Sequence, residues 1–78
     1  MLKEYFIVYY IEDLTTSETH EVSKHLSQAK AQAVAEAYTA KHGVLTTIDW
    51  QLEEITANGR EILDTEADNY GGAYPPVK

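Results

Sequence analysis

The apolar positions of the chain separate it into strands and a helix. Residues 5–11 (YFIVYYI) are aromatic or β-branched throughout, a composition typical of a strand. Both the odd-numbered and the even-numbered residues of this run are apolar. A strand with one solvent-exposed face would alternate apolar and polar residues, so a central strand is predicted. Turn-forming residues 12–18 follow, and residues 19–24 hold one sizeable apolar side chain, Val22. A strand this polar suits the edge of a sheet.

A helix is predicted over residues 28–41. Ser27 provides an N-cap before it, and Gly43 can adopt the left-handed conformation that ends a helix. Projected at about 100° per residue, one stripe gathers Leu26, Ala29, Ala33, Ala37 and Ala40. This stripe is predicted to face the sheet. Alanine buries little area, so the large core side chains are expected to come from the strands.

A third strand is predicted after the helix. Ile48, Trp50 and Leu52 are separated by polar residues, which is the pattern of a strand with one buried face. Because Trp50 belongs to the apolar set of this strand, its side chain is expected to lie beneath the helix.

The dipeptide Asn58-Gly59 lies between two β-compatible runs and predicts a hairpin turn. If these two residues form the loop, Glu53 faces Asp64 and Ile55 faces Ile62. A three-residue turn with a bulge would shift that register, because a slip of one residue turns every following side chain to the other face.

The elements follow the order strand, strand, helix, strand, strand in a chain of 78 residues. A chain of this length holds one small core. The order predicts an α+β domain over residues 1–67: a small antiparallel four-stranded sheet (ββαββ) with one helix packed on one face. Residues 68–78 (DNYGGAYPPVK) break the pattern with two glycines and two prolines, which predicts a flexible C-terminal tail.

The composition excludes several classes of protein. There is no cysteine, which rules out a disulfide scaffold, a zinc finger and thiol catalysis. No apolar stretch approaches the roughly 18 residues that a membrane span needs. Thirteen acidic residues against six lysines and arginines give a net charge of −7. This charge argues against direct binding to nucleic acid or to an anionic membrane.

Candidate catalytic and metal-binding residues form no established pattern. His20 and His25, with Glu18 or Glu21 as a third ligand, lack the spacing of a known metal site. The sequence contains neither a nucleophile elbow nor a glycine-rich phosphate loop. We therefore expect no metal, no cofactor and no enzymatic activity.

Acidic residues concentrate in the predicted C-terminal hairpin. Seven of the thirteen lie within residues 49–68, beside one base, Arg60. Their mutual repulsion opposes compactness. Two explanations stay open: the acids keep the protein soluble, or they form a docking face for a basic partner.

The first strand offers a second surface feature. Glu4 and Glu12 are in phase with Phe6 and Tyr10, which places that set outward and the alternate residues 5, 7, 9 and 11 against the helix. Aromatic side chains ringed by charges are typical of contact centres, although the tail or a second copy of the chain would also cover such a patch. The predicted partner-binding residues are Phe6, Tyr10, Asp49, Glu53, Ile55, Ile62, Asp64 and Glu66.

Four local features carry a resemblance to a known family: the helix start Leu26-Ser27-Gln28-Ala29-Lys30, the helix end His42-Gly43, the strand at Ile48-Asp49 and the turn Asn58-Gly59. Over residues 26–64 the chain resembles small bacteriophage anti-CRISPR proteins active against type I-F surveillance complexes, in length and in the order of elements. It is also similar to a shorter phage protein that inhibits host RNA polymerase. The present chain is far more acidic, and no contact residue is carried over.

The charge and the resemblance together predict a non-catalytic inhibitor from a phage or mobile element, acting in the cytoplasm of a bacterial host. Its expected partner is a host protein or ribonucleoprotein complex with a basic surface, first of all a CRISPR surveillance complex. Two alternatives stay open: a homo-oligomeric structural or accessory phage protein, such as a homodimer, and an inhibitor of host RNA polymerase.

Overall fold

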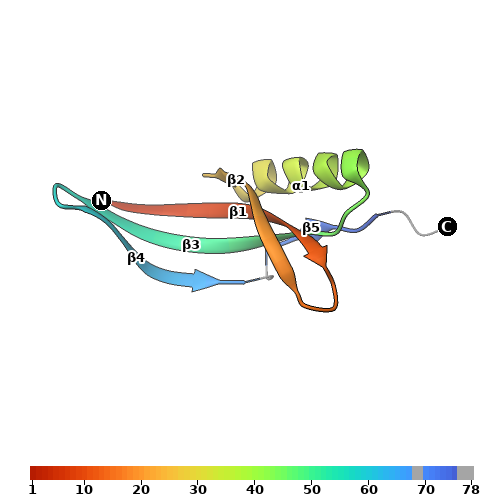
Figure 1. Cartoon of the computed structure of the whole chain (residues 1–78). Coiled ribbons are helices and arrows are strands. Elements are labelled where there is room, and N and C mark those ends of the chain that lie inside the picture. The colour runs from red at the N-terminus through yellow and green to blue at the C-terminus, as the bar shows by residue number, and fades with distance from the viewer. Residues whose placement is uncertain (68–69, 76–78) are drawn as a thin grey trace.

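The computed structural model describes residues 1–67 and 70–75 (Figure 1). Its elements are β1 (Leu2–Asp13), β2 (Glu18–His25), α1 (Gln28–His42), β3 (Thr46–Thr56), β4 (Gly59–Glu66) and β5 (Gly72–Ala73). The strands form one antiparallel sheet of order β2-β1-β3-β4, and the short β5 pairs with β3. The predicted α+β fold is therefore confirmed, with β1 central and β2 at an edge.

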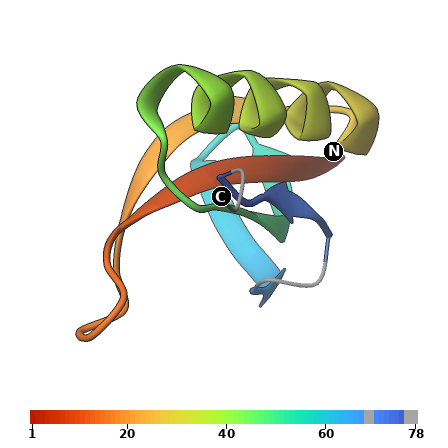
Figure 2. The same ribbon diagram turned by 90° about the vertical axis from the view of Figure 1, so that its right-hand side faces the viewer.

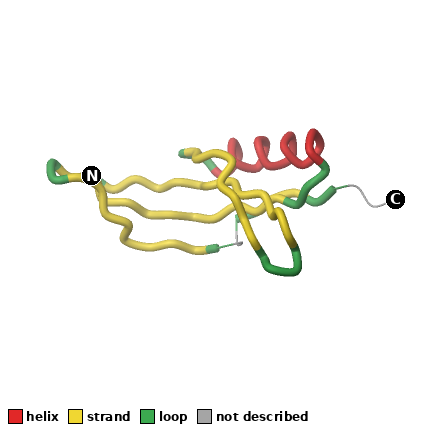
Figure 3. The backbone as a smooth tube through the Cα atoms, in the orientation of Figure 1, coloured by secondary structure: helices red, strands yellow, loops and turns green. Residues whose placement is uncertain are grey.

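The helix covers only one end of the sheet. It lies over β1, β2 and the beginning of β3, while β1, β3 and β4 continue past it as a three-stranded ribbon (Figure 1 and Figure 3). The end view shows the helix on one side of the twisted sheet and nothing helical on the other (Figure 2). The molecule measures 50 × 26 × 17 Å along its principal axes. A long ribbon with short helical cover leaves much of the sheet open to solvent.

The core lies between the helix and the middle of β1. Phe6, Val8 and Ile48 pack with Ala31 and Ala35, and all five are buried. The prediction that Phe6 points outward is therefore wrong, and the faces of the first strand are reversed.

The error has a physical cause in the length of β1. Glu4 does share the face of Phe6, as its phase implies, but it lies beyond the helix where that face meets solvent. One face of a twelve-residue strand is thus buried in the middle and wet at its end. Ile7, on the opposite face, is also only 3 % exposed.

The helix begins and ends as predicted, but it turns a different face to the sheet. The Ser27 hydroxyl accepts a hydrogen bond from the Lys30 N–H at 3.2 Å, and Gly43 adopts a left-handed conformation with φ of 68°. The buried residues are Ala31, Ala35 and Thr39, whereas the predicted stripe is exposed: Leu26, Ala29, Ala33, Ala37 and Ala40. Alanines occur on several sides of this helix, so their periodicity does not distinguish one face. Among the described residues, no helix combines the length and the apolar character needed to cross a membrane.

The β3–β4 hairpin has a different register from the one predicted. Thr56 pairs with Gly59, so the two-residue loop is 57–58 and not Asn58-Gly59. A register shift between Leu52 and Glu53 then interrupts the ladder. Because of the changed loop, Glu53 faces Ile62 instead of Asp64, and Ile55 faces Arg60 instead of Ile62; beyond the register shift, Asp64 faces Leu52.

The described part of the C-terminal segment, residues 70–75, is fixed to the domain. The Gln32 side chain donates to the Gly72 carbonyl oxygen at 2.6 Å and accepts from the Gly72 N–H at 3.0 Å. The Ala73 N–H donates to the Thr46 hydroxyl at 3.0 Å. Tail residues 68–69 and 76–78, also predicted to be flexible, lie outside the described residues.

Candidate docking face

The ribbon beyond the helix presents a surface of alternating carboxylates and apolar side chains, on the same face of the sheet as the helix. Cross-strand partners share a face, and the register places Glu4 and Asp64 on either side of Leu52, and Glu61 opposite Glu54. We call this surface the acidic platform, and its members are Leu2, Glu4, Leu52, Glu54, Glu61, Asp64 and Glu66.

Two aromatic residues form the inner border of the acidic platform. Trp50 is half-buried, and its ring centroid lies 6.3 Å from that of Tyr70. Tyr70 also packs edge-on against Phe6 at 5.7 Å. Trp50 thus faces the helix side of the sheet, as predicted, but lies at the rim of the core next to the C-terminal segment.

The hydroxyl of Tyr70 lies against one carboxylate of the platform and within the electrostatic influence of two others. This hydroxyl donates a hydrogen bond of 2.5 Å to Glu66. The pKa of Tyr70 lies above its ordinary value, first because of this bond, then because of burial and the Glu66 charge. The charges of Glu4 and Asp64 raise this pKa further. A hydroxyl influenced by acids of both β1 and β4 indicates a concentrated negative field.

Part of this charge is held at a cost to stability. Glu54 and Glu61 lie directly opposite each other on neighbouring strands, an arrangement that costs a few tenths of a kcal/mol or more. The Glu54 Oε2 atom is buried and has no hydrogen-bond partner among the described residues, while Oε1 lies 3.4 Å from the Met1 amino nitrogen. Charges kept against stability are typical of surfaces that bind something.

The opposite face of the sheet carries a different, internally neutralised cluster. Glu53 is 3 % exposed, and its carboxylate accepts hydrogen bonds from Lys24 at 2.5 Å and from Gln51 at 2.6 Å. Arg60 lies 4.0 Å away. The Lys24 ammonium also stands 4.3 Å from the centre of the Tyr5 ring, within cation–π range. Glu53 is therefore a structural group that ties β2 to β3 across β1.

Four of the predicted docking residues are not placed to form one exposed acidic face. Phe6 belongs to the core, and the ring of Tyr10 stacks on Tyr38 of the helix at 5.5 Å. Glu53 is buried in its ion pair, and Asp49 lies beside Ile7 on that same opposite face. The register shift at Leu52 separates this pair of acids from Asp64 and Glu66, which the two-residue loop would have placed beside them.

The other four predicted residues lie on the ribbon. Asp64 and Glu66 are exposed members of the acidic platform. Ile55 is half-buried and Ile62 is 60 % exposed, both on the face opposite the platform. The prediction omitted Leu2, Glu4, Leu52, Glu54, Glu61 and Tyr70. Of these, Glu4 could have been found from its alternation with Phe6, if the first strand is taken to extend beyond the helix.

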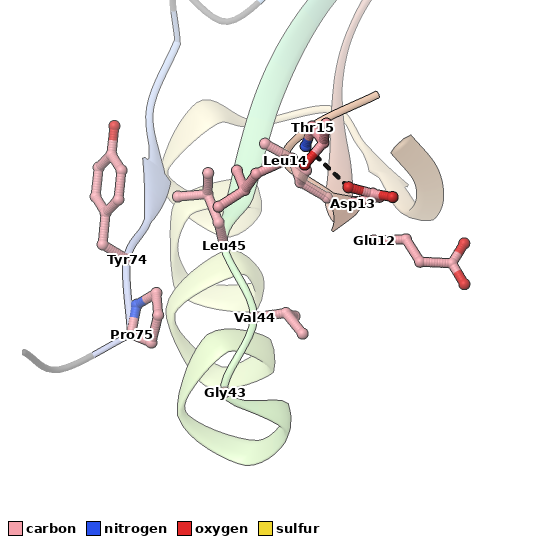
Figure 4. Close-up of a pocket in the computed structure, with 10 residues that line it drawn as sticks. Glu12, Asp13, Leu14, Thr15, Gly43, Val44, Leu45, Tyr74 and Pro75 are labelled. Atoms are coloured by element: carbon pink, nitrogen blue, oxygen red, sulfur yellow. Dashed lines mark hydrogen bonds between the residues drawn. The ribbon is translucent and has the colours of Figure 1, made fainter. Parts of the chain in front are cut away.

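A hollow lies at the other end of the molecule, between the β1–β2 turn and the end of the helix (Figure 4). Its volume is about 690 Å³. The walls are mainly apolar: Ile11, Leu14, Val44, Leu45, Tyr74 and Pro75. Asp13 accepts a hydrogen bond from the Thr15 N–H at 2.8 Å, on the side away from Tyr74 (Figure 4). A hollow with mainly apolar walls is typical of a site that binds an apolar group, and not of a site for acid–base catalysis.

Comparison of the chain with protein-family models, with curated proteins and with solved structures finds no match. Its function is therefore inferred from the geometry and charge of its surfaces.

The ion pair between Lys24 and Glu53 predicts a characteristic pH dependence. The pKa of Glu53 lies below its ordinary value of 4.5, chiefly because of the hydrogen bond from Lys24, with burial acting in the opposite direction. A carboxyl group with a lowered pKa in the folded state stabilises the fold above its unfolded pKa. This contribution is lost as the pH falls below 4.5 and through the lowered folded value.

Replacing Lys24 with methionine keeps an unbranched side chain, one heavy atom shorter, and removes the charge. We expect a lower melting temperature at neutral pH, and a smaller further loss on acidification, than in the parent. Thermal unfolding followed by circular dichroism from neutral to acidic pH measures both, with the exposed Lys30→Met as the charge-matched control. Equal melting temperatures of the parent and the Lys24 variant at every pH would show that the ion pair contributes nothing to stability.

Proposed function

We propose that this protein is a non-catalytic inhibitor that docks, through the acidic platform, on a basic surface of a host protein or ribonucleoprotein complex. One observation supports this above the others: Glu4 and Asp64 lie on either side of Leu52, and Glu66 lies opposite Trp50, on a sheet face that the helix leaves uncovered. Electrostatic complementarity of this kind steers association and selects partners by charge.

The mechanism is competition for cationic side chains. Lysines and arginines that hold phosphate groups in a nucleic-acid-binding site would pair instead with the platform carboxylates. Leu52 and Trp50, both half-buried, and Leu2, 60 % exposed, supply apolar contact area among the charges. A partner occupied in this way is blocked without any chemical reaction.

The resemblance over residues 26–64 makes a type I-F CRISPR surveillance complex in a bacterial cytoplasm the first target to test, and host RNA polymerase the second. A separate observation supports self-association as another candidate function: the edge strand β4 exposes Ile62 by 60 % and Leu63 by 49 %. Light scattering distinguishes a monomer from a homodimer, and a dimer that dissociates in Ile62→Lys would favour self-association.

Neutralising two carboxylates tests the docking proposal. The double variant Asp64→Asn, Glu66→Gln keeps an acceptor oxygen for the Thr65 N–H and for the Tyr70 hydroxyl, so its fold should be preserved. We expect its affinity for the purified type I-F complex to fall by about tenfold or more, with a weaker dependence of the association rate on salt. Surface plasmon resonance at low and high ionic strength measures both quantities.

A matched control removes the same charge elsewhere. Glu21 and Glu36 are exposed and lie outside the platform, so Glu21→Gln, Glu36→Gln should bind as the parent does. Equal losses of affinity in the two double variants would show that binding depends on the net charge of the protein and not on the acidic platform. Direct binding of the parent to DNA or RNA would overturn the proposal. So would the finding that the parent binds neither the surveillance complex nor the polymerase.

A further inference from the structure

Three side chains able to bind a metal meet on the β1–β2 hairpin, at the end of the molecule opposite the β3–β4 turn (Figure 1). They are Glu12, Glu18 and His20, and one ligand atom from each lies within 4.8 Å of the other two. Glu12 and Glu18 are exposed and His20 is half-buried, so the group is open to solvent on one side.

The fold brings this group together through an irregularity in the β1–β2 ladder. Tyr10 pairs with His20, and the register then shifts between Ile11 and Asp13, which leaves Glu12 with no residue directly opposite. Glu18 is two residues from His20 on β2, so these two side chains share one face, and Glu12, at the irregularity of β1, places its carboxylate beside them. Bulges commonly redirect a side chain in this way.

The imidazole ring of His20 is held in place by aromatic stacking. Its ring stacks on Tyr10, with centroids 5.1 Å apart and an interplanar angle of 25°. Tyr10 in turn stacks on Tyr38 of the helix. The Nε2 atom of His20 contacts the Glu12 carboxylate. The direction of the nitrogen is thus set by the sheet and the helix, which favours a ligand that must be bound at a fixed angle.

We propose that this group binds a borderline divalent metal ion such as Zn²⁺, through Nε2 of His20 and one carboxylate oxygen each of Glu12 and Glu18. Zinc–nitrogen and zinc–oxygen bonds are about 2.0–2.2 Å long, so ligand atoms in a tetrahedral site lie about 3.4 Å apart. Small side-chain rotations bring atoms that are within 4.8 Å to that separation. Three protein ligands leave a fourth position for water.

The mixed donor set selects the kind of ion. A nitrogen with two carboxylate oxygens suits zinc and its neighbours, whereas Mg²⁺ and Ca²⁺ prefer oxygen ligands alone. An ion pair between His20 and Glu12 forms without a metal and needs nothing from Glu18, whereas a metal ion held by all three residues needs the Glu18 carboxylate. Glu18 is therefore the residue that separates a metal site from a simple ion pair.

Zinc titration of the full chain tests the proposal. Isothermal titration calorimetry with zinc chloride should show one saturable site per chain, and zinc should raise the melting temperature because it binds the folded state. Mg²⁺ should produce neither effect. Glu18→Gln should weaken zinc binding by about tenfold or more, and His20→Gln should abolish it.

His25 supplies the matched control, since its ring contacts the Ser23 hydroxyl at 2.7 Å and takes no part in the cluster. His25→Gln should bind zinc as the parent does. Nuclear magnetic resonance of the parent gives a readout independent of any variant's folding, because zinc should shift the imidazole signals of His20 far more than those of His25 and His42. The proposal is overturned by no saturable binding, by undiminished binding in Glu18→Gln, or by shifts centred on another histidine.

Discussion

Replacing Ile48 with alanine should lower the free energy of unfolding by about 2–5 kcal/mol, through lost apolar burial and the cavity that remains. Ile48 is 0 % exposed and is among the largest fully buried side chains of the described residues. Its neighbours in the core are Phe6, Val8, Ala31 and Ala35. Alanines held by a helix cannot move to fill the space, so the full cost should appear. For so small a domain this loss is a large part of its stability.

Urea denaturation followed by circular dichroism measures this effect. Ile62→Ala is the control, because Ile62 is 60 % exposed and its truncation should change stability by no more than about 0.5 kcal/mol. Similar losses in the two variants would contradict the assignment of the core to the helix-covered end of the sheet.

The second large effect is expected at Gly72, where alanine should cost about 3 kcal/mol and release the C-terminal segment. Gly72 has φ of +137°, which side-chain-bearing residues rarely adopt. A Cβ atom there would stand 2.2 Å from the Thr46 carbonyl oxygen and 2.9 Å from the Thr47 Cα. Both are backbone atoms of β3, so no rotamer change removes the clash.

Gly43 provides the comparison for Gly72. It also has a positive φ, +68°, but no atom lies within 4 Å of a Cβ built there. Gly43→Ala should therefore cost only the left-handed backbone penalty of about 1 kcal/mol. Hydrogen exchange at the Ile48 N–H, which donates to the Gly71 carbonyl, reports whether the segment has left β3. Equal melting temperatures and equal exchange in the two variants would refute the steric argument.

The local features of the fold were predictable, and the choice of faces was not. Helix caps and strand composition act within a few residues, so Ser27, Gly43 and the apolar run of β1 were interpreted correctly. The buried face of β1 depends on how far the helix reaches along it, since both of its faces are apolar. The helix face depends on which of several alanines approach the sheet.

In the candidate site, too, local features were predictable and long-range contacts were not. Asp64 and Glu66 are exposed, as expected, but they share the face of Trp50 and Leu52 and not that of Glu53, because the register of β4 differs from the predicted one. Glu53 was misplaced because its partner, Lys24, reaches it from β2 across the whole of β1. Tyr70 was missed because its role depends on residues 70–75 returning to the helix. Contacts between residues this far apart in sequence leave no trace in local patterns.

The exposure of β4 has a consequence for the behaviour of the protein in concentrated solution. This strand is the outermost of the described sheet beyond β3, and all eight of its residues are exposed. Free edge strands template the addition of strands from other molecules. Here the repeated negative charge of Glu61, Asp64 and Glu66 makes two copies repel. The resistance of the protein to aggregation is therefore coupled to the ionisation of these carboxylates. Near the isoelectric point the repulsion between copies disappears. We then expect the edge that bears Ile62 and Leu63 to pair with strands of other molecules and to cause precipitation.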